Sequence, residues 1–402
     1  MSPAIRSLLA NAGALGVVAV ALVLLMNADL SRPDSLSSTE TIATTTPKAG
    51  QIAAVVETES PAPPTPPRST PVKKTAPSSM PVVSGAASSS LISTSKTTDA
   101  DDSSVARTQN PYPFPPQGFP LVNEQTRAAL VNILCAPRSG SLRPISGSGV
   151  IIDPRGVILT NAHVAQYVLL SQDARVDLSC VIRAGSPARA MWSAEVLYIP
   201  PVWIREHAKD IIADHATGTG EHDYALLYIT GPATESSPSP RPSQFPALPV
   251  DTREAIGFLG DLALVASYPA EFIGSIAAQS DLYSASSVTP IQDLLTFHTK
   301  TVDLISLGGV IEAQSGSSGG AVVNAWGHLI GVITTTSEGA TTAERDLRAI
   351  TLSYIDRDLV VQTGFDLATI LGGDVAAQAA DFNAQEAPAL NRLLIDQISK
   401  TR

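Results

Sequence analysis

Three polar residues, far apart along the chain, have the side chains that hydrolysis through a serine nucleophile requires. Ser318 lies in the Gly/Ser segment 316–320, His163 follows an apolar strand-like run, and Asp223 begins another such run. A serine hydroxyl attacks a carbonyl only when a base takes its proton and donors stabilise the developing oxyanion. Histidine is the commonest base, and backbone amides in a glycine-rich turn are suitable donors. Together these residues predict a centre for acyl transfer.

Taken singly, each residue also has an ordinary structural explanation. His163, in LTNAHVA, would serve as a structural histidine; Asp223, before YALLYI, as a capping aspartate; and GSSGG as a simple turn. The Gly/Ser segment gains weight from its position, because the apolar run AVVN follows it directly and the turn AWG leads into HLIGVIT. The prediction of a catalytic centre therefore depends on the order and spacing of the three residues.

The combined pattern is much more specific than its parts. The order is TNAHV, then DYALL, with Asp223 60 residues after His163, then GSSGG, with Ser318 95 residues after Asp223. This order resembles that of the trypsin-like, chymotrypsin-fold serine peptidases. GSGVIID followed by GVILTNAHV, and the serine inside GSSGG, are more similar to the bacterial HtrA/Deg branch. The similarity covers about residues 120 to 360.

The resemblance implies a role for each matching residue. Ser318 would be the nucleophile, His163 the general base and then acid, and Asp223 the group that orients and stabilises the imidazolium. The amides of Gly316 and Ser318 would form the oxyanion hole. The strand 331–336 would pair with an extended or unfolded polypeptide substrate. The resemblance therefore implies a serine endopeptidase, a hydrolase that needs no cofactor and no metal.

The sequence also departs from the family in two places. Ser317 precedes the nucleophile, where trypsin-type zymogens have an aspartate that pairs with a new N-terminus, so we do not expect that activation route. The HtrA/Deg branch usually has a PDZ domain after the protease, and the roughly 40 residues after 362–364 are too few for one. We therefore expect no regulation through a PDZ domain, and a homo-oligomer is left open.

Substrate specificity has the weakest signal. Glu312 lies six residues before Ser318, where the family often has a pocket-wall residue, and a carboxylate there would attract Lys or Arg. The alternative, a solvated charge at a strand end, is the favoured interpretation. A mid-sized apolar substrate pocket is predicted from the run Gly331, Val332, Ile333, Thr334 and Thr335.

The segments that would position these residues are mostly strand-like. From Gly118 onward, short Val- and Ile-rich runs alternate with Gly, Pro, Asp and Ser, which is typical of an all-β domain. Residues 147–160 read as a hairpin, and a Pro-rich break at 232–249 divides the β region into two comparable parts. We predict a double six-stranded β-barrel over 119–362. Further strands are expected at 175–183, 194–199, 225–229, 263–267, 320–324, 328–335 and 348–352. A helix packed on the second barrel and a more peripheral one are expected beyond 352, with 363–402 as a helical tail.

The N-terminal part has a different composition. Residues 7–26 are almost wholly apolar and follow Arg6, which predicts a membrane-spanning helix with the rest of the chain translocated. An uncleaved anchor within 1–30 is favoured over a cleaved signal because no clear cleavage site follows. Residues 31–110 contain no aromatic residue, so 31–118 is expected to be a disordered linker. The catalytic part would then be extracytoplasmic, periplasmic or extracellular.

The cysteines, the net charge and the remaining histidines bear on whether the chain forms a disulfide, binds nucleic acid or binds a metal. Cys135 and Cys180 both end apolar runs, and they either form a disulfide, as export would allow, or remain two buried thiols. The net charge of −11 comes without a basic stripe, so a nucleic-acid partner is not expected. A metal site is not expected in the loop that contains His207, Asp210, Asp214 and His215, and His222 is interpreted as a loop histidine.

A competing hypothesis belongs to another functional class. The chain would then be a catalytically inactive protease-fold module that binds extended peptides, or an envelope scaffold. The presence of all three triad residue types in the right order favours the enzyme. Reaction of Ser318 with a fluorophosphonate separates the two hypotheses.

Overall fold

The computed structural model describes residues 111–139, 142–213, 219–234, 240–254, 256–271, 280–298, 300–337 and 339–400. The expected membrane anchor and most of the expected linker lie outside these residues. Among the helices of the described ranges, none has both the length and the apolar character that a bilayer crossing requires.

Six antiparallel strands close into the first barrel. They follow the order β1-β2-β3-β6-β5-β4, and β4 pairs with β1 to complete the ring. The strands are β1 (Leu130–Pro137), β2 (Ile145–Asp153), β3 (Val157–Thr160), β4 (Leu178–Ala184), β5 (Arg189–Tyr198) and β6 (Ala225–Pro232). Side chains on both faces of these strands, such as Ile133, Val150 and Leu226, have no exposed surface. The predicted hairpin is β2–β3, and its turn is closed by a 2.9 Å bond from the Gly156 amide to the Asp153 carbonyl.

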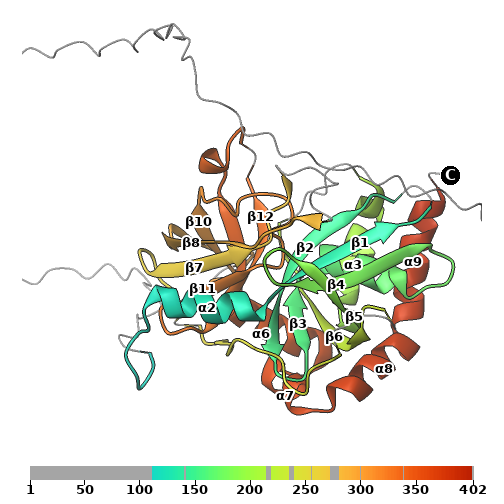
Figure 1. Cartoon of the computed structure of the whole chain (residues 1–402), viewed down its shortest axis with the longest axis horizontal. Helices are drawn as coiled ribbons and strands as arrows, with labels where there is room; N and C mark the ends of the chain where they lie inside the picture. The colour runs from blue at the N-terminus through green and yellow to red at the C-terminus, as the bar shows by residue number, and fades with distance from the viewer. Residues whose placement is uncertain are drawn as a thin grey trace, which may run out of the picture. The chain divides into compact units, whose positions relative to one another are not determined.

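A second, curled antiparallel sheet lies beside the first barrel (Figure 1). Its order is β8-β7-β11-β12-β13-β10-β9. The strands are β7 (Leu262–Ser267), β8 (Ala285–Pro290), β9 (Asp293–Leu295), β10 (Leu304–Gly308), β11 (Ala321–Asn324), β12 (Leu329–Thr336) and β13 (Leu347–Thr351). The expected double barrel is confirmed in its coarse form, although this sheet has seven strands because the short β9 is added to its edge.

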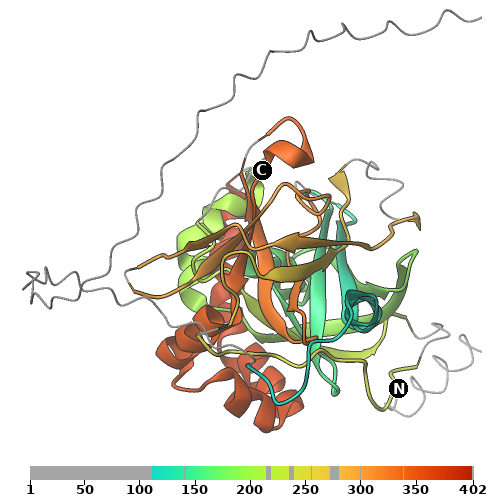
Figure 2. The same cartoon turned by 90° about the vertical axis from the view of Figure 1, so that its left-hand side faces the viewer.

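Helices connect and cover the two sheets. α2 (Phe119–Ala129) lies against β7 and leads into β1, and Figure 2 shows it nearly end-on. α3 (Ala162–Ser171) follows β3, and α4 (Pro201–His207) with the 3₁₀ turn η2 (Ala208–Ile212) follows β5. A second 3₁₀ turn, η4 (Thr342–Glu344), precedes β13. These helices were not predicted: α2 precedes the first strand, and the others are short segments between strands.

The C-terminal helices pack more closely than expected. α6 (Leu352–Thr363) lies on β12 and β13, where a helix packed on the second barrel was expected. α7 (Leu367–Gly372) follows it. α8 (Val375–Gln385) and α9 (Ala387–Ser399) lie on the outside of the first barrel (Figure 1). Asn383 donates to the Val196 carbonyl at 2.8 Å, and Leu390 and Leu394 are buried. The peripheral tail was a wrong expectation, because the apolar face of α9 is covered by the first barrel's helices.

The end of the expected linker belongs to the folded part. The Tyr112 ring stacks on His328 with centroids 4.3 Å apart, and its hydroxyl contacts Asp251 and accepts from Asn324 at 2.8 Å. The expected boundary at 118 is therefore too late, and ordered contacts with the second sheet already begin at residue 112.

Candidate active site

His163 is held by its backbone and its ring at once. It lies in the first turn of α3, which starts directly after β3. Its backbone N–H donates to Asp223 Oδ1 at 2.9 Å, and its Nδ1 lies 2.7 Å from Asp223 Oδ2. Because Nδ1 is bound to a carboxylate, the neutral ring carries its proton there and Nε2 is left as the proton acceptor. The ring is 29 % exposed, so this nitrogen belongs to an accessible base.

Asp223 is buried between the two sheets and is supplied with donors from both. Besides His163, it accepts a bond from Thr334 Oγ1 on β12 at 2.8 Å. Its own carbonyl accepts from Asn161 Nδ2 at 2.8 Å, which ties the residue to the start of α3. A buried carboxylate without such partners would be costly. The arrangement therefore keeps a charged acid next to the imidazole.

The pair perturbs both pKa values in the sense expected of a histidine base. Burial by itself lowers the pKa of His163. The charge and the hydrogen bond of Asp223 together raise this pKa by more than burial lowers it, so the net direction is upward. Burial raises the pKa of Asp223, but His163 and Thr334 lower it more, so the net direction is downward. The carboxylate thus stays ionised and stabilises a protonated imidazole.

The loop that carries Ser318 is fixed to both sheets. The Ser318 carbonyl accepts a 2.7 Å bond from the Ser148 amide of β2. On the other side, the Gly319 amide donates to the Ile333 carbonyl at 2.9 Å. Ile333 directly precedes Thr334, the residue that donates to Asp223. The loop is thus attached to β12 one residue from the group that supports the acid, and the junction brings together three distant parts of the chain.

Two amides in this loop are left for a ligand. The amides of Ser317, Gly319 and Gly320 donate to carbonyls at 2.8–3.2 Å. The amides of Gly316 and Ser318, in contrast, donate to no protein acceptor among the residues that the structure describes. These are the two donors that the sequence assigned to an oxyanion hole.

Ser317 and Gly319 show why the loop needs small residues. The Ser317 side chain is buried and its Oγ accepts from Ser267 Oγ at 2.9 Å, so it holds the loop to β7. Gly319 has a φ of +86°, and a Cβ there would overlap the Ser148 carbonyl oxygen and Thr160 Oγ1. Only glycine allows the loop to approach β2 so closely.

Glu312 is not the solvated charge that we favoured from the sequence. It is fully buried, and Ser287 Oγ donates to its Oε1 at 3.1 Å. Within the described part of the chain, its Oε2 has no hydrogen-bond partner. Burial raises the pKa of this carboxyl. An interior acid with one oxygen unpaired is suited to receive a donor from a ligand.

Most of the residues assigned to a substrate pocket are in the interior. Gly331 and Val332 pair with both β11 and β13, and Val332 and Ile333 are core side chains. Thr334 supports Asp223 instead of lining a pocket. From Thr334 to Thr336 the strand pairs with β13 only, so the free edge is shorter than predicted.

Several other assignments can be placed. Cys135 and Cys180 face each other across β1 and β4 and form a disulfide. His207 Nδ1 lies 2.9 Å from Asp210 Oδ2, while Asp214 and His215 lie outside the described residues. Sequence reasoning missed Ser148, Asn161 and the role of Thr334. Ser148 and Asn161 did have a signal, because they belong to the GSGVIID and TNAHV motifs.

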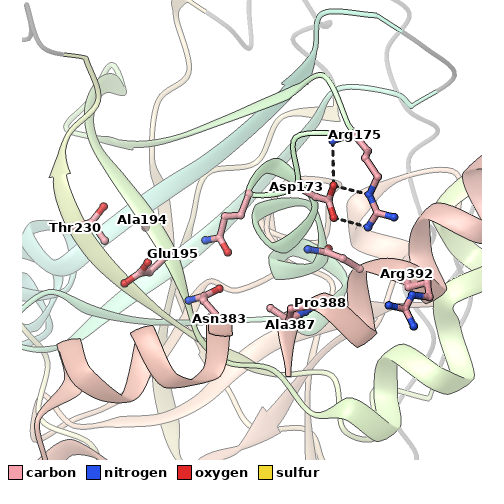
Figure 3. A pocket seen from close by; sticks show the side chains of 11 residues that line it. Asp173, Arg175, Ala194, Glu195, Thr230, Asn383, Ala387, Pro388 and Arg392 are labelled. Carbon is pink, nitrogen blue, oxygen red and sulfur yellow. Dashed lines mark hydrogen bonds and ion pairs between the residues drawn. The ribbon is translucent and has the colours of Figure 1, made fainter. Parts of the chain in front are cut away.

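A separate cavity of about 530 Å³ lies between the first barrel and helices α8 and α9 (Figure 3). Its wall includes Asp173 and Arg175, which form an ion pair at 2.7 Å just after the end of α3. Gln172 at the end of α3 also lines the cavity, whereas His163 is on the first turn of α3. The rise of the helix separates these two residues by about 13 Å along its axis. This cavity is therefore distinct from the junction that holds His163.

Residues 147–332 match a family model of the trypsin-like peptidase domain. The matched segment runs from β2 into β12 and contains His163, Asp223 and Ser318. No curated protein matched the sequence. The match supports a function of the serine-protease type.

Proposed function

We propose that the chain is a serine endopeptidase in which Ser318, His163 and Asp223 act as a catalytic triad. The observation that carries the proposal is the double contact of Asp223 with the backbone and ring of His163, reinforced by Thr334. This contact leaves Nε2 as the free base, and the loop of Ser318 is bonded to Ile333, next to Thr334. The match to the trypsin-like peptidase domain supports the same reaction class.

The proposed reaction is the two-step hydrolysis of a peptide bond. Ser318 Oγ attacks the carbonyl carbon while its proton passes to His163 Nε2. The oxyanion of the tetrahedral intermediate accepts hydrogen bonds from the unpaired amides of Gly316 and Ser318. His163 then donates the proton to the leaving amine, and a water attacks the acyl-ester with His163 again as base. Ser318 is thereby regenerated.

The proposed substrate is an extended or unfolded polypeptide. The edge of β12 at 334–336 pairs with β13 on one side and has no backbone partner on the other within the described residues. A substrate strand would add to this edge. Glu312, with its unpaired Oε2, favours a Lys or Arg side chain in the specificity pocket.

The proposed location is an extracytoplasmic compartment, with the protein tethered through residues 7–26. The apolar run after Arg6 supports the tether, and the Cys135–Cys180 disulfide supports an oxidising compartment. Kinship with the HtrA/Deg branch is proposed from the motifs around His163 and Ser318, and a homo-oligomer is proposed from that kinship. The tether is tested by carbonate extraction of membranes from cells that produce either the full chain or a chain lacking residues 1–30. Only the full chain should stay with the membranes.

The reaction is tested by labelling with a fluorophosphonate and by hydrolysis of casein. We expect the wild-type protein to be labelled at Ser318, and Ser318→Ala to lose both labelling and hydrolysis. Ser315→Ala is the matched control, because its hydroxyl is exposed in the same loop. A well-folded wild-type protein that binds casein without labelling or hydrolysis would instead support the inactive peptide-binding module.

A further inference from the structure

The residues on both sides of Asp223 are bound to one buried carboxylate. Asp358 lies on α6 and is 7 % exposed. Its Oδ2 accepts a 2.9 Å bond from the Tyr224 hydroxyl and lies 2.9 Å from Nδ1 of His222. His222 and Tyr224 immediately precede and follow Asp223 in the chain. The residues on each side of the acid are therefore attached to α6 through their side chains.

His222 adopts a backbone conformation that must be held in place. Its φ is +57°, in the left-handed region that non-glycine residues rarely occupy because it is strained. Two side chains of α6 hold it: the Tyr354 hydroxyl accepts from the His222 amide at 3.1 Å, and Asp358 binds the ring. Tyr354 and Asp358 are four residues apart and so lie on one face of the helix. This face sets the direction in which the chain enters Asp223.

We infer that Asp358 is a positioning residue for Asp223, an inference that rests on the proposed function. Among the described contacts of Asp358 there is none with Ser318, His163 or Asp223, so it acts through the backbone on either side of Asp223. Asp223 must present Oδ1 to the His163 amide and Oδ2 to the ring, and a small rotation of its peptide breaks one of these contacts. The helix that follows the last strand of the second sheet thereby aligns an acid at the edge of the first barrel.

Charge strengthens this attachment. The hydrogen bond to Asp358 is the main cause that raises the pKa of His222, and the charges of Asp358, Glu221 and Glu206 raise it as well, while burial opposes them. Glu221 lies near two histidines, because its Oε1 is 3.8 Å from Nε2 of His222 and 3.1 Å from Nε2 of His298. The raised pKa favours an imidazolium–carboxylate pair between His222 and Asp358, which is stronger than a neutral hydrogen bond.

The test is Asp358→Asn in the full chain. We expect kcat to fall about tenfold to thirtyfold with KM within about twofold, since a sub-ångström misplacement of a catalytic group costs less than the hundredfold of a full ångström. We also expect the pKa of His163, measured by NMR, to move downward, because a misaligned Asp223 raises it less. Asp356→Asn is the matched control. Asp356 is on the same helix and accepts from the Leu367 amide at 2.8 Å, so this change affects the α6–α7 junction alone.

Two milder variants keep the inference testable if Asp358→Asn does not fold. Tyr224→Phe removes one hydroxyl, and His222→Asn removes the ring while keeping a residue type that tolerates the left-handed conformation. We expect each to lower kcat about threefold. In the background of Asp358→Asn neither should have its full effect, because the interactions they remove are already weakened.

The outcomes separate the inference from the proposed function. Wild-type kcat, KM and His163 pKa in Asp358→Asn would overturn the inference while the enzyme reaction stands. A wild-type protein without labelling or hydrolysis would overturn the proposed function instead. In that case the NMR pKa of His163 still decides whether Asp358 positions Asp223, since the measurement needs no turnover.

Discussion

Gly319→Ala tests whether the close approach of the Ser318 loop to β2 is needed for catalysis. A Cβ at this position would overlap the Ser148 carbonyl oxygen and lie 2.8 Å from the carbonyl carbon. Carbon–oxygen contacts relax to about 3.3 Å or more, so the loop has to move by more than about 1 Å. The loop cannot move freely, because the Ser318 carbonyl and the Gly319 amide are bonded to the two sheets at 2.7 and 2.9 Å. A displacement of this size lowers kcat about a hundredfold.

The assay compares kcat, KM and thermal unfolding of Gly319→Ala with those of Gly364→Ala. Gly364 has a similar φ of +83°, but a Cβ there would meet nothing within 4 Å. Both substitutions introduce left-handed strain of about 1–2 kcal/mol, and a few degrees of Tm follow from it. Only Gly319→Ala should also lose activity. A kcat for Gly319→Ala within threefold of that for Gly364→Ala would refute the reasoning.

Three further predictions follow from the charges and the cross-link. Because Asp223 raises the pKa of His163 and the base must be neutral, the acid limb of kcat/KM should have its midpoint above the ordinary histidine pKa of about 6.5, and Asp223→Asn should shift it to lower pH. Burial raises the pKa of Glu312, so its ionisation destabilises the fold as pH rises. Glu312→Gln should therefore raise Tm at pH 8 by a few degrees and leave Tm unchanged near pH 4. The same substitution should reduce cleavage after Lys and Arg relative to cleavage after apolar residues. Reduction of the Cys135–Cys180 disulfide should lower stability by about 2–4 kcal/mol in denaturant unfolding, whereas a protein with both cysteines changed to serine should not respond to reductant. An unaltered acid limb, a Tm gain at pH 4 as large as at pH 8, or an unfolding midpoint insensitive to reductant would contradict the respective prediction.

The strands were predictable where their patterns are local. The hairpin at 147–160 and strands such as β6, β7 and β13 were expected within a few residues of their observed bounds. β8, β9 and β10 were missed because their residues, for example those of ASSVTP, lack a clear alternation of apolar side chains. β8 is stabilised by pairing with β7, β10 by pairing with β13, and β9 by pairing with β10, and such pairing is a property of the tertiary structure.

The site shows the same division between local and long-range information. The His163 and Asp223 motifs indicated a base and an acid, and the structure brings the two side chains into contact. Glu312 and Thr334 were misjudged, one as solvated and the other as part of a pocket. Neither burial nor a partner more than a hundred residues away is encoded in the spacing around those residues.

The sequence by itself determined the class of chemistry, because a serine between glycines, a histidine after an apolar strand and an aspartate before another are local patterns with a fixed order. Only the tertiary structure decided which groups support them: Thr334 donates to Asp223, Ser148 donates to the Ser318 carbonyl, and Asp358 of α6 binds the neighbours of the acid. These contacts join residues far apart in the chain. They depend on how two sheets and a helix pack together, and packing is set by the whole fold.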